Sequence, residues 1–295
     1  MVNQDGPIVG IDLGTTNSAV AAIVDGQPQV LAEENETILP SVVAVDADGK
    51  LMTGVLARNQ LAAFPERTVA SIKRRMGTME PVPLGDQTFT PPEISAVILR
   101  RLRDRAARAL GQQVGRAVIT VPAFFDENQR QATLEAGELA GLKVERIINE
   151  PTAASLVYHA GEHDPKQILV YDLGGGTFDV SIVRMEDGVV EVLSSKGDTK
   201  LGGDDLDRAL LDLVADEFQE QYQIDLRESS TTHYRLLQAC ERAKVELSTK
   251  ETAQIAEEFI ADKEGQPLNL VTDVTRDAFE HLIEPLIERT ISCVD

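Results

Sequence analysis

Residues 168–183 read ILVYDLGGGTFDVSIV, and residues 8–23 read IVGIDLGTTNSAVAAI. In both stretches an apolar run leads into Asp-Leu-Gly, small and hydroxylated residues follow, and a second apolar run closes the segment. Such β-prone runs on both sides of a glycine-containing turn are typical of two antiparallel strands. The sequence therefore predicts the same strand–turn–strand unit twice, once at Asp12 and once at Asp172.

The similarity continues beyond these stretches. Asp25-Gly26 and Asp187-Gly188 both predict a tight hairpin turn, and a third predicted strand follows each of them. Val30-Leu31 then matches Val192-Leu193, with a short insertion in the later copy. We interpret this as an internal duplication that produces two similar lobes.

The segment between the two copies alternates predicted helices and strands. Helical spacing of apolar residues predicts a helix over 93–110, which Gly111 ends. Predicted strands over 117–121 and 144–148 flank a predicted helix over 126–140, and a short helix over 150–159 follows. This alternation predicts an α/β layered lobe.

The chain after the second copy is mostly helical in pattern. We predict helices over 204–222 and 234–248, a strand-like stretch over 253–272 with a turn at 263–266, and a final helix from 276. We place the break between the lobes near 161–166. Lobe I then covers 1–163 and lobe II covers 164–295.

The composition restricts the partners. The chain has 295 residues and a net charge of −21, which disfavours nucleic acid and anionic membranes because their phosphates are repelled. An acidic protein can still bind ATP where a metal ion and backbone N–H groups neutralise the phosphates. No signal peptide or membrane span is apparent, and Cys240 and Cys293 match no metal spacing, so we expect a reduced, cytoplasmic protein.

The repeated loop has a specific chemical use. Glycines let the backbone turn sharply and approach a ligand closely, and the exposed N–H groups form a concave anion site. An Asp at the strand end repels phosphate but can hold Mg²⁺, which in turn binds phosphate oxygens. Two such loops facing each other would hold one triphosphate between two lobes. The alternative is that each Asp-Leu-Gly is an ordinary strand-end turn.

Five motifs carry a resemblance to a known family. They are IDLGTTNS at 11–18, ITVPAFFDENQRQAT at 119–133, INEPTAA at 148–154, YDLGGGTFDVS at 171–181 and LGGDDLD at 201–207. In this order they resemble the nucleotide-binding domain of the 70-kilodalton heat-shock chaperones, of the bacterial DnaK type, over essentially the whole chain. The resemblance implies the two-lobed α/β fold of the actin and chaperone ATPases, which is ribonuclease-H-like with a duplicated core, and an Mg²⁺-dependent ATPase that binds ATP and ADP.

The resemblance also implies roles within the repeated loops. Asp12 and Asp172 would organise Mg²⁺ through water, with Asp172 also counted in the catalytic group. Thr177 would place a hydroxyl near the γ-phosphate, and Asp179 would lie near the metal or its water. The residues implied in holding the nucleotide are Gly14, Thr15, Thr16, Asn17, Gly174, Gly175, Gly176, Thr177, Gly202 and Gly203.

Two further catalytic residues come from the resemblance. Lys73 would reach the cleft beside the γ-phosphate and the attacking water, and the alternative for this Lys beside two Arg is a solvated surface. Glu150 would orient water or the metal, and the alternative is a helix-capping role alone. Arg74 is the candidate for an interdomain contact, and Pro122 and Arg130 resemble the family's lobe-coupling hinge and relay.

The helix that contains ACERAKVELS supplies the implied adenosine contacts. Glu241, Lys244 and Ser248 lie at i, i+3 and i+7, on one face of that helix. In the family this face contacts ribose and adenine. An ordinary solvent-facing ion pair fits the same spacing.

The resemblance extends to partners and to the extent of the domain. Lobe II lacks counterparts of the last two strands of lobe I, and nothing resembles the family's peptide clamp, so we expect a C-terminally truncated ATPase domain without a peptide site. A J-domain co-chaperone and a nucleotide-exchange factor are the implied protein partners. The alternatives are a non-catalytic nucleotide-sensing or co-chaperone-binding fragment, an actin-like filament protein and a sugar kinase.

Overall fold

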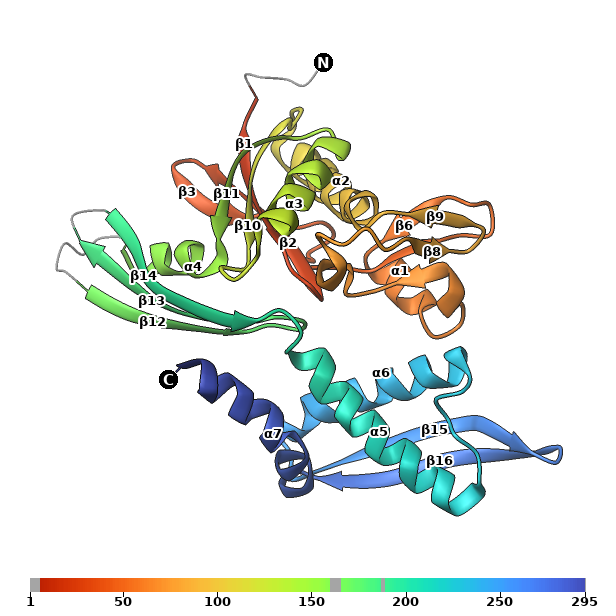
Figure 1. The fold of residues 1–295 in the computed structure, drawn as a ribbon. Helices are drawn as coiled ribbons and strands as arrows, with labels where there is room; N and C mark the ends of the chain where they lie inside the picture. The colour runs from red at the N-terminus through yellow and green to blue at the C-terminus, as the bar shows by residue number, and fades with distance from the viewer. Residues whose placement is uncertain (1–5, 160–165, 187–188, 295) are drawn as a thin grey trace.

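The computed structural model describes residues 6–159, 166–186 and 189–294, and Figure 1 shows their arrangement. The predicted lobe boundary at 163/164 and the second hairpin turn, Asp187-Gly188, lie outside the described residues. The first hairpin turn is described, and it has the predicted form. Asp25 has φ 51° and Gly26 has φ 78°, as a turn with two left-handed residues requires.

Lobe I is built on a six-stranded mixed sheet. Its main path runs β11-β10-β1-β2-β3, and a short strand pairs with β2 from the side. The neighbours of β1 are β10 in parallel and β2 in antiparallel orientation. The strands are β1 (Ile8–Leu13), β2 (Asn17–Val24), β3 (Gln27–Val30), β4 (Leu39–Pro40), β10 (Arg116–Val121) and β11 (Lys143–Asn149).

Two capped helices connect the parallel strands. Helix α2 (Pro91–Leu110) begins at a capping box in which Thr90 and Glu93 satisfy each other's backbone N–H groups, and Gly111 ends it with φ 66°. Helix α3 (Glu127–Leu139) has the same device at Asp126 and Gln129. Fully buried side chains of α2 pack into one core with the strands, so the predicted α/β lobe is confirmed.

Short elements form the outer part of lobe I. These elements are α1 (Val55–Gln60), β5 (Val43–Val45), β6 (Leu51–Thr53), β7 (Thr68–Val69), β8 (Val82–Leu84), β9 (Gln87–Phe89) and the 3₁₀ turns η1 (Pro65–Arg67) and η2 (Ile72–Arg75). In Figure 1 the strands β6, β8 and β9 lie together with helix α1 above α6 (Ser230–Leu247) of lobe II.

Lobe II begins with a three-stranded antiparallel sheet in the order β12-β13-β14. These strands are β12 (Lys166–Leu173), β13 (Phe178–Glu186) and β14 (Val189–Asp198). They repeat the antiparallel path β1-β2-β3 of lobe I, which confirms the predicted duplication of the hairpins. Helix α4 (Glu150–His159) leads from β11 and packs on this sheet.

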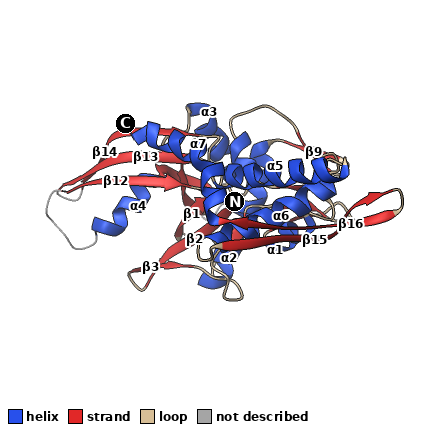
Figure 2. Ribbon diagram, turned by 90° about the horizontal axis from the view of Figure 1, so that it is seen from below, coloured by secondary structure: helices blue, strands red, loops and turns tan. Residues whose placement is uncertain are grey.

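The rest of lobe II has a core of its own. Helix α6 (Ser230–Leu247) packs on α5 (Gly203–Tyr222) and on the hairpin of β15 (Thr252–Lys263) and β16 (Gln266–Thr275), and these elements share one core. Helix α7 (Arg276–Val294) packs on α5 and returns to β14. Figure 2 shows the β15–β16 hairpin and the β12–β14 sheet at opposite ends of the molecule. Helix α6 begins earlier than the predicted residue 234, because Ser229 accepts a bond from the Thr232 N–H and caps it.

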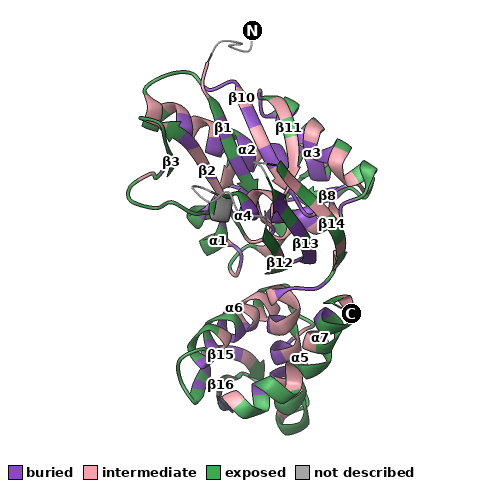
Figure 3. Ribbon diagram, turned by 90° about the vertical axis from the view of Figure 1, so that its left-hand side faces the viewer, coloured by how far each residue is buried: buried purple, intermediate pink, exposed green. Residues whose placement is uncertain are grey.

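The two hairpin sheets differ in how well they are covered. Strand β1 alternates buried and exposed residues, whereas on β12 Leu169 is 54% and Tyr171 is 41% exposed (Figure 3). Helix α7 covers part of this face, where the Tyr171 hydroxyl donates to Thr290 Oγ1 at 2.6 Å. Among the described helices none combines the length and the apolar character needed to cross a lipid bilayer.

Candidate functional site

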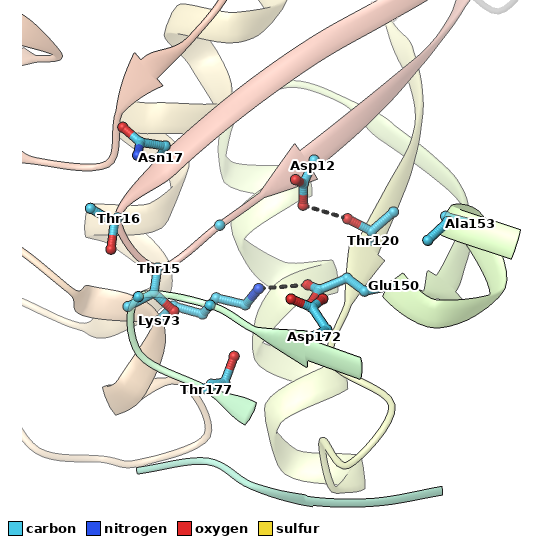
Figure 4. A pocket seen from close by; sticks show the side chains of 14 residues that line it. Asp12, Thr15, Thr16, Asn17, Lys73, Thr120, Glu150, Ala153, Asp172 and Thr177 are labelled. Carbon is cyan, nitrogen blue, oxygen red and sulfur yellow. Dashed lines mark hydrogen bonds and ion pairs between the residues drawn. The ribbon is translucent and has the colours of Figure 1, made fainter. Parts of the chain in front are cut away.

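Both copies of the repeated loop line one cavity of about 440 Å³, shown in Figure 4. The first loop follows β1, the second follows β12, and η2 and the start of α4 complete the walls. The lining residues are Asp12, Gly14, Thr15, Thr16, Asn17, Lys73, Thr120, Glu150, Ala153, Ala154, Asp172, Gly174, Gly175 and Thr177. The strand-end residues Asp12 and Asp172 therefore line one cavity, as the duplication predicted.

The first loop has an unsatisfied hydroxyl. Among the described residues, Thr16 Oγ1 is buried and has no hydrogen-bond partner. Gly14 is required by the tightness of this turn, because a Cβ there would lie 2.0 Å from the Asn17 carbonyl oxygen. A buried hydroxyl without a partner costs about 1–3 kcal/mol, so this wall of the cavity is suited to a ligand that supplies a polar atom.

The second loop is tied to the start of α5. The Gly174 N–H donates to the Thr177 carbonyl at 3.0 Å, which closes the turn. The N–H groups of Gly203 and Asp204 donate to the carbonyls of Gly174 and Gly175, at 2.9 and 2.8 Å. Gly202 makes this contact possible, because a Cβ there would lie 2.6 Å from the Gly174 carbonyl oxygen.

The two loops touch each other across the lobes. A Cβ at Gly175 would lie 1.8 Å from Thr16 Oγ1, and a Cβ at Gly176 would lie 2.3 Å from Thr15 Cγ2. The absence of side chains in the second loop therefore lets the two lobes close on each other. Three of the glycines implied in nucleotide binding, Gly176, Gly202 and Gly203, do not line the cavity. They shape the second loop and its contact with α5.

Lys73 lies in the cavity and forms an ion pair with Glu150. The Lys73 ammonium donates to Glu150 Oε1 at 2.6 Å, and the two side chains are only 6% and 15% exposed. The ring of Phe125 lies 5.8 Å from the ammonium. The alternative of a solvated Lys73 is therefore wrong. Glu150 occupies the first turn of α4, where its charge favours the helix, and reaches the cavity from there.

Carboxylates outnumber cations in the cavity. The lining contains three carboxylates, Asp12, Glu150 and Asp172, and one ammonium, Lys73. Burial raises the pKa of Glu150 and of Asp172, and the positive charge of Lys73 partly offsets this rise. The Thr120 hydroxyl donates to Asp12 Oδ1 at 2.9 Å and fixes that carboxylate. This donor set of carboxylate oxygens with excess negative charge fits a hard divalent cation such as Mg²⁺.

The carboxylates do not form a closed cage. No group of three or more His, Cys, Asp or Glu side chains in the described part of the chain lies close enough together to hold a metal ion without other ligands. A cation at this site would therefore take further oxygens from water or from phosphate. That arrangement is the usual one for Mg²⁺, which binds through one or two carboxylates and keeps several waters.

Asp179 lies behind the second loop and is 2% exposed. Its Oδ1 accepts the Phe124 N–H at 3.0 Å, from the loop between β10 and α3 of lobe I. Burial is the main cause that raises the pKa of Asp179 to about 7, and the Phe124 bond acts in the opposite direction. Gly197 of β14 leaves room for this contact, since a Cβ there would lie 3.0 Å from Asp179 Oδ1.

The predicted adenosine contacts lie further along the cleft. Glu241 lines a second cavity of about 860 Å³, which shares Thr15, Thr16 and Asn17 with the first. Lys244 and Ser248 do not line either cavity. The Lys244 ammonium donates to the Gly203 carbonyl at 3.2 Å and to Asp207 at 2.8 Å, and burial raises the pKa of Asp207 to about 6.

Sequence reasoning missed several residues of the site. Thr120, Ala153 and Ala154 line the first cavity, and Thr120 is paired with Asp12 in the parallel register of β1 and β10. That pairing explains the Thr120 contact, because the carboxyl ends of neighbouring parallel strands meet at one edge.

Two arginines that the sequence had singled out make different kinds of contact. Arg74 contacts lobe II: it pairs with Asp205 and donates to the Gly176 carbonyl. Arg130 donates to Asn149 Oδ1 at 2.9 Å, within lobe I.

The fold and the cavity define a class: a two-lobed α/β protein with a duplicated hairpin core and one phosphate-type loop from each lobe. The family described as Hsp70 protein matches the chain over residues 8–83 and 79–295. The chain belongs to the Hsp70 family, which confirms the resemblance of its five motifs.

Individual relatives agree with this assignment. The chain is 50% identical over 286 residues to the chaperone protein DnaK of Halobacterium salinarum, which covers 96% of this chain and 45% of that protein. It is also 50% identical over 287 residues to the chaperone protein DnaK of Thermotoga neapolitana, which covers 96% of this chain and 48% of that protein. The chain thus spans about half the length of the curated relatives it matches.

Proposed function

We propose that this chain binds and hydrolyses ATP with Mg²⁺, as the ATPase domain of a DnaK-like chaperone. One observation carries the proposal: the two copies of the Asp-Leu-Gly loop line one cavity around Lys73. A single phosphate-type loop occurs in many proteins, but two that converge on a buried ammonium, beside carboxylates that fit a divalent cation, suit a metal-bound polyphosphate. The Hsp70 membership of the chain supports the same assignment.

The loops would hold the phosphates. Thr15, Thr16 and Asn17 come from lobe I, and Gly174, Gly175 and Thr177 come from lobe II. The Thr16 hydroxyl is buried against Gly175 without a partner, so it would reach a phosphate oxygen by rotating its side chain, which would remove its desolvation cost. Asp12 and Asp172 would hold Mg²⁺ through its waters, and the ion would supply charge neutralisation to the phosphates.

Lys73 and Glu150 would act on the transferring phosphoryl group. The Lys73 ammonium is held at a fixed place by Glu150 Oε1, and it would stabilise the negative charge that spreads over the phosphoryl oxygens. Glu150 and Asp172 have raised pKa values, so both are suited to accept a hydrogen bond from an attacking water and to orient it. Thr177 would place its hydroxyl beside the same group.

The adenosine end would lie toward α6. Glu241 lines the second cavity. Lys244 is paired with Asp207, so this ion pair would have to break before Lys244 could contact a nucleotide. We propose Glu241, Lys244 and Ser248 as ribose and adenine contacts on the family resemblance. A J-domain co-chaperone, a nucleotide-exchange factor and a cytoplasmic location belong to the same proposal.

A non-catalytic nucleotide-sensing or co-chaperone-binding fragment is the second candidate, and hydrolysis separates the two. Single-turnover cleavage of γ-labelled ATP should be measured with excess chain and Mg²⁺. We expect cleavage by the parent chain and a reduction of at least tenfold in Lys73→Ala, with Arg75→Met as a control. Nucleotide binding without cleavage in the parent chain would favour the sensing fragment.

A further inference from the structure

The three glycine carbonyls of the second loop are fixed by two different lobes. The carbonyls of Gly174 and Gly175 accept the N–H groups of Gly203 and Asp204, which are both in lobe II. The carbonyl of Gly176 accepts Arg74 Nε at 2.8 Å, and Arg74 belongs to η2 of lobe I. Only the third carbonyl therefore depends on the position of the other lobe.

The Arg74 guanidinium is itself held in place. Its two terminal nitrogens donate to the two oxygens of Asp205, in the first turn of α5. This is a bidentate pair, and the two side chains are only 12% and 18% exposed. Asp205 also accepts the Gly202 N–H at 2.8 Å, so the same carboxylate orders the start of α5. A fork of this kind fixes direction as well as distance.

A second contact joins η2 to α5. The Ser71 hydroxyl donates to Asp204 Oδ2 at 2.5 Å, and the Ser71 backbone lies in the left-handed region with φ 53°. Ser71 and Arg74 flank Lys73, and the contacts of both with α5 cross the lobes. The position of the Lys73 backbone is therefore tied to the start of α5 on both sides.

The Gly176 carbonyl has a direct consequence for ligand contacts. The C=O and the N–H of one peptide unit point in opposite directions. A carbonyl held against Arg74 turns the Thr177 N–H to the opposite side of the loop, and Thr177 lines the cavity. Arg74 does not line the cavity, so it acts through the loop.

We propose that Arg74, held by Asp205, is a positioning residue that orients the lobe II phosphate loop only when the two lobes are closed. This inference rests on the proposed nucleotide site. The inference adds one condition to that site. The Gly176–Thr177 peptide takes the orientation needed for phosphate contacts only when Arg74 of lobe I lies against lobe II. Gly176 is part of the device, because a Cβ there would lie 2.8 Å from Arg74 Nε.

The first test needs no nucleotide. Hydrogen exchange of the Gly174, Gly203 and Asp204 amides, which donate to the carbonyls of Thr177, Gly174 and Gly175, should be measured on the whole chain and on Arg74→Met, Asp205→Asn and Arg75→Met. Arg75 is the matched control, since its guanidinium donates to the Pro81 carbonyl at 2.8 Å within lobe I. We expect exchange of the Gly174 amide, whose bond to the Thr177 carbonyl closes the turn, to be about tenfold faster in Arg74→Met and in Asp205→Asn, and to change by less than about twofold in Arg75→Met. Unchanged exchange of the Gly174 amide in both test variants would overturn the proposal.

The second test uses ligand release. Release of a fluorescent ATP analogue in Mg²⁺ should be about tenfold faster in Arg74→Met, and intermediate in Arg74→Lys, whose single ammonium cannot serve Asp205 and Gly176 together. Adenosine, which has no phosphate, should bind the parent chain and Arg74→Met equally, a result that a general loss of stability would not give. Equal release rates from Arg74→Met and Arg75→Met would refute the proposed role. A parent chain that binds no nucleotide would refute the proposed function instead, and the exchange test would still decide on Arg74.

Discussion

Removal of the Lys73 ammonium should destabilise the protein in a way that depends on pH. In Lys73→Met, Glu150 keeps a carboxylate that is 15% exposed and loses its 2.6 Å partner. The buried carboxylate can stay charged without a partner, at a cost of about 3–5 kcal/mol. Alternatively it can take up a proton. From an ordinary pKa of 4.5, protonation at pH 7 costs about 3.4 kcal/mol, at about 1.36 kcal/mol for each pH unit.

The cheaper route sets the expected magnitude. We expect Lys73→Met to lose about 3 kcal/mol of unfolding free energy at pH 7 and about 1 kcal/mol at pH 5.5. The sign follows from the lost ammonium: Lys73 lowers the pKa of Glu150 in the parent chain, so without it the folded variant binds more protons than the folded parent chain, and the deficit grows as the pH rises. The double variant Lys73→Met/Glu150→Gln has no carboxylate at this position and should recover most of the loss.

Urea denaturation at both pH values measures these differences, with Arg75→Met as the control. Arg75 is a neighbouring Arg whose partner Glu80 lies 4.0 Å away with a side chain that is 74% exposed, so its removal should cost less than about 0.5 kcal/mol at either pH. A Lys73→Met deficit that is equal at pH 5.5 and pH 7, or that the Glu150→Gln change does not relieve, would refute the buried ion pair.

Three further predictions address the loops and the second sheet. Burial raises the pKa of Asp179 to about 7, so on its account the parent chain should lose about 1.4 kcal/mol of stability per pH unit between pH 5 and pH 6, and about half of that slope should remain at pH 7. Asp179→Asn, which can still accept the Phe124 N–H, should flatten that decline in a pH series of urea melts, and parallel curves would contradict the assignment. Gly202→Ala should lower the unfolding free energy by at least about 2 kcal/mol, because the new Cβ meets the Gly174 carbonyl. Gly10→Ala is the control, since nothing lies within 4 Å of its Cβ, and it should cost less than about 1 kcal/mol. Similar melting temperatures for the two variants would show that the loop can relax. Among the described strands, β12 pairs with β13 alone, whereas β1 pairs with a strand on each side. Amides of β12 that point away from β13 should therefore exchange hydrogen at least tenfold faster than amides of β1. Equal protection of the two strands would mean that this edge is covered.

Much of the fold could be predicted from the sequence, because its signals are local. The two Asp-Leu-Gly hairpins, the helix over 93–110 and the turn at 263–266 depend on spacing and turn residues that lie within one segment. The start of helix α6 was predicted too late. Its first turn is polar, so the spacing of apolar residues does not reveal it, and the Ser229 cap was not recognised. The lobe boundary at 163/164 remains a prediction.

The loops of the site were predicted from the sequence, but the residue pairs that join the lobes were not. The repeat itself pointed to Asp12, Asp172 and their glycines, which lie together in the structure. The resemblance pointed to Arg74 for an interdomain contact, but its partner Asp205 lies 131 positions away, and no local pattern identifies that partner. Lys244 shows the opposite limit: helical spacing placed it beside Glu241, but the packing of α5 against α6 gives it Asp207 as its partner.

The central claim is that two facing loops and their strand-end carboxylates hold a metal-bound triphosphate. Isothermal titration of the parent chain with ATP, in Mg²⁺ and in EDTA, tests it most directly. We expect saturable binding in Mg²⁺ that weakens at least tenfold in EDTA, and a loss of the Mg²⁺ effect in both Asp12→Asn and Asp172→Asn. An affinity for ATP that is the same with and without Mg²⁺, and the same in both variants, would contradict the claim.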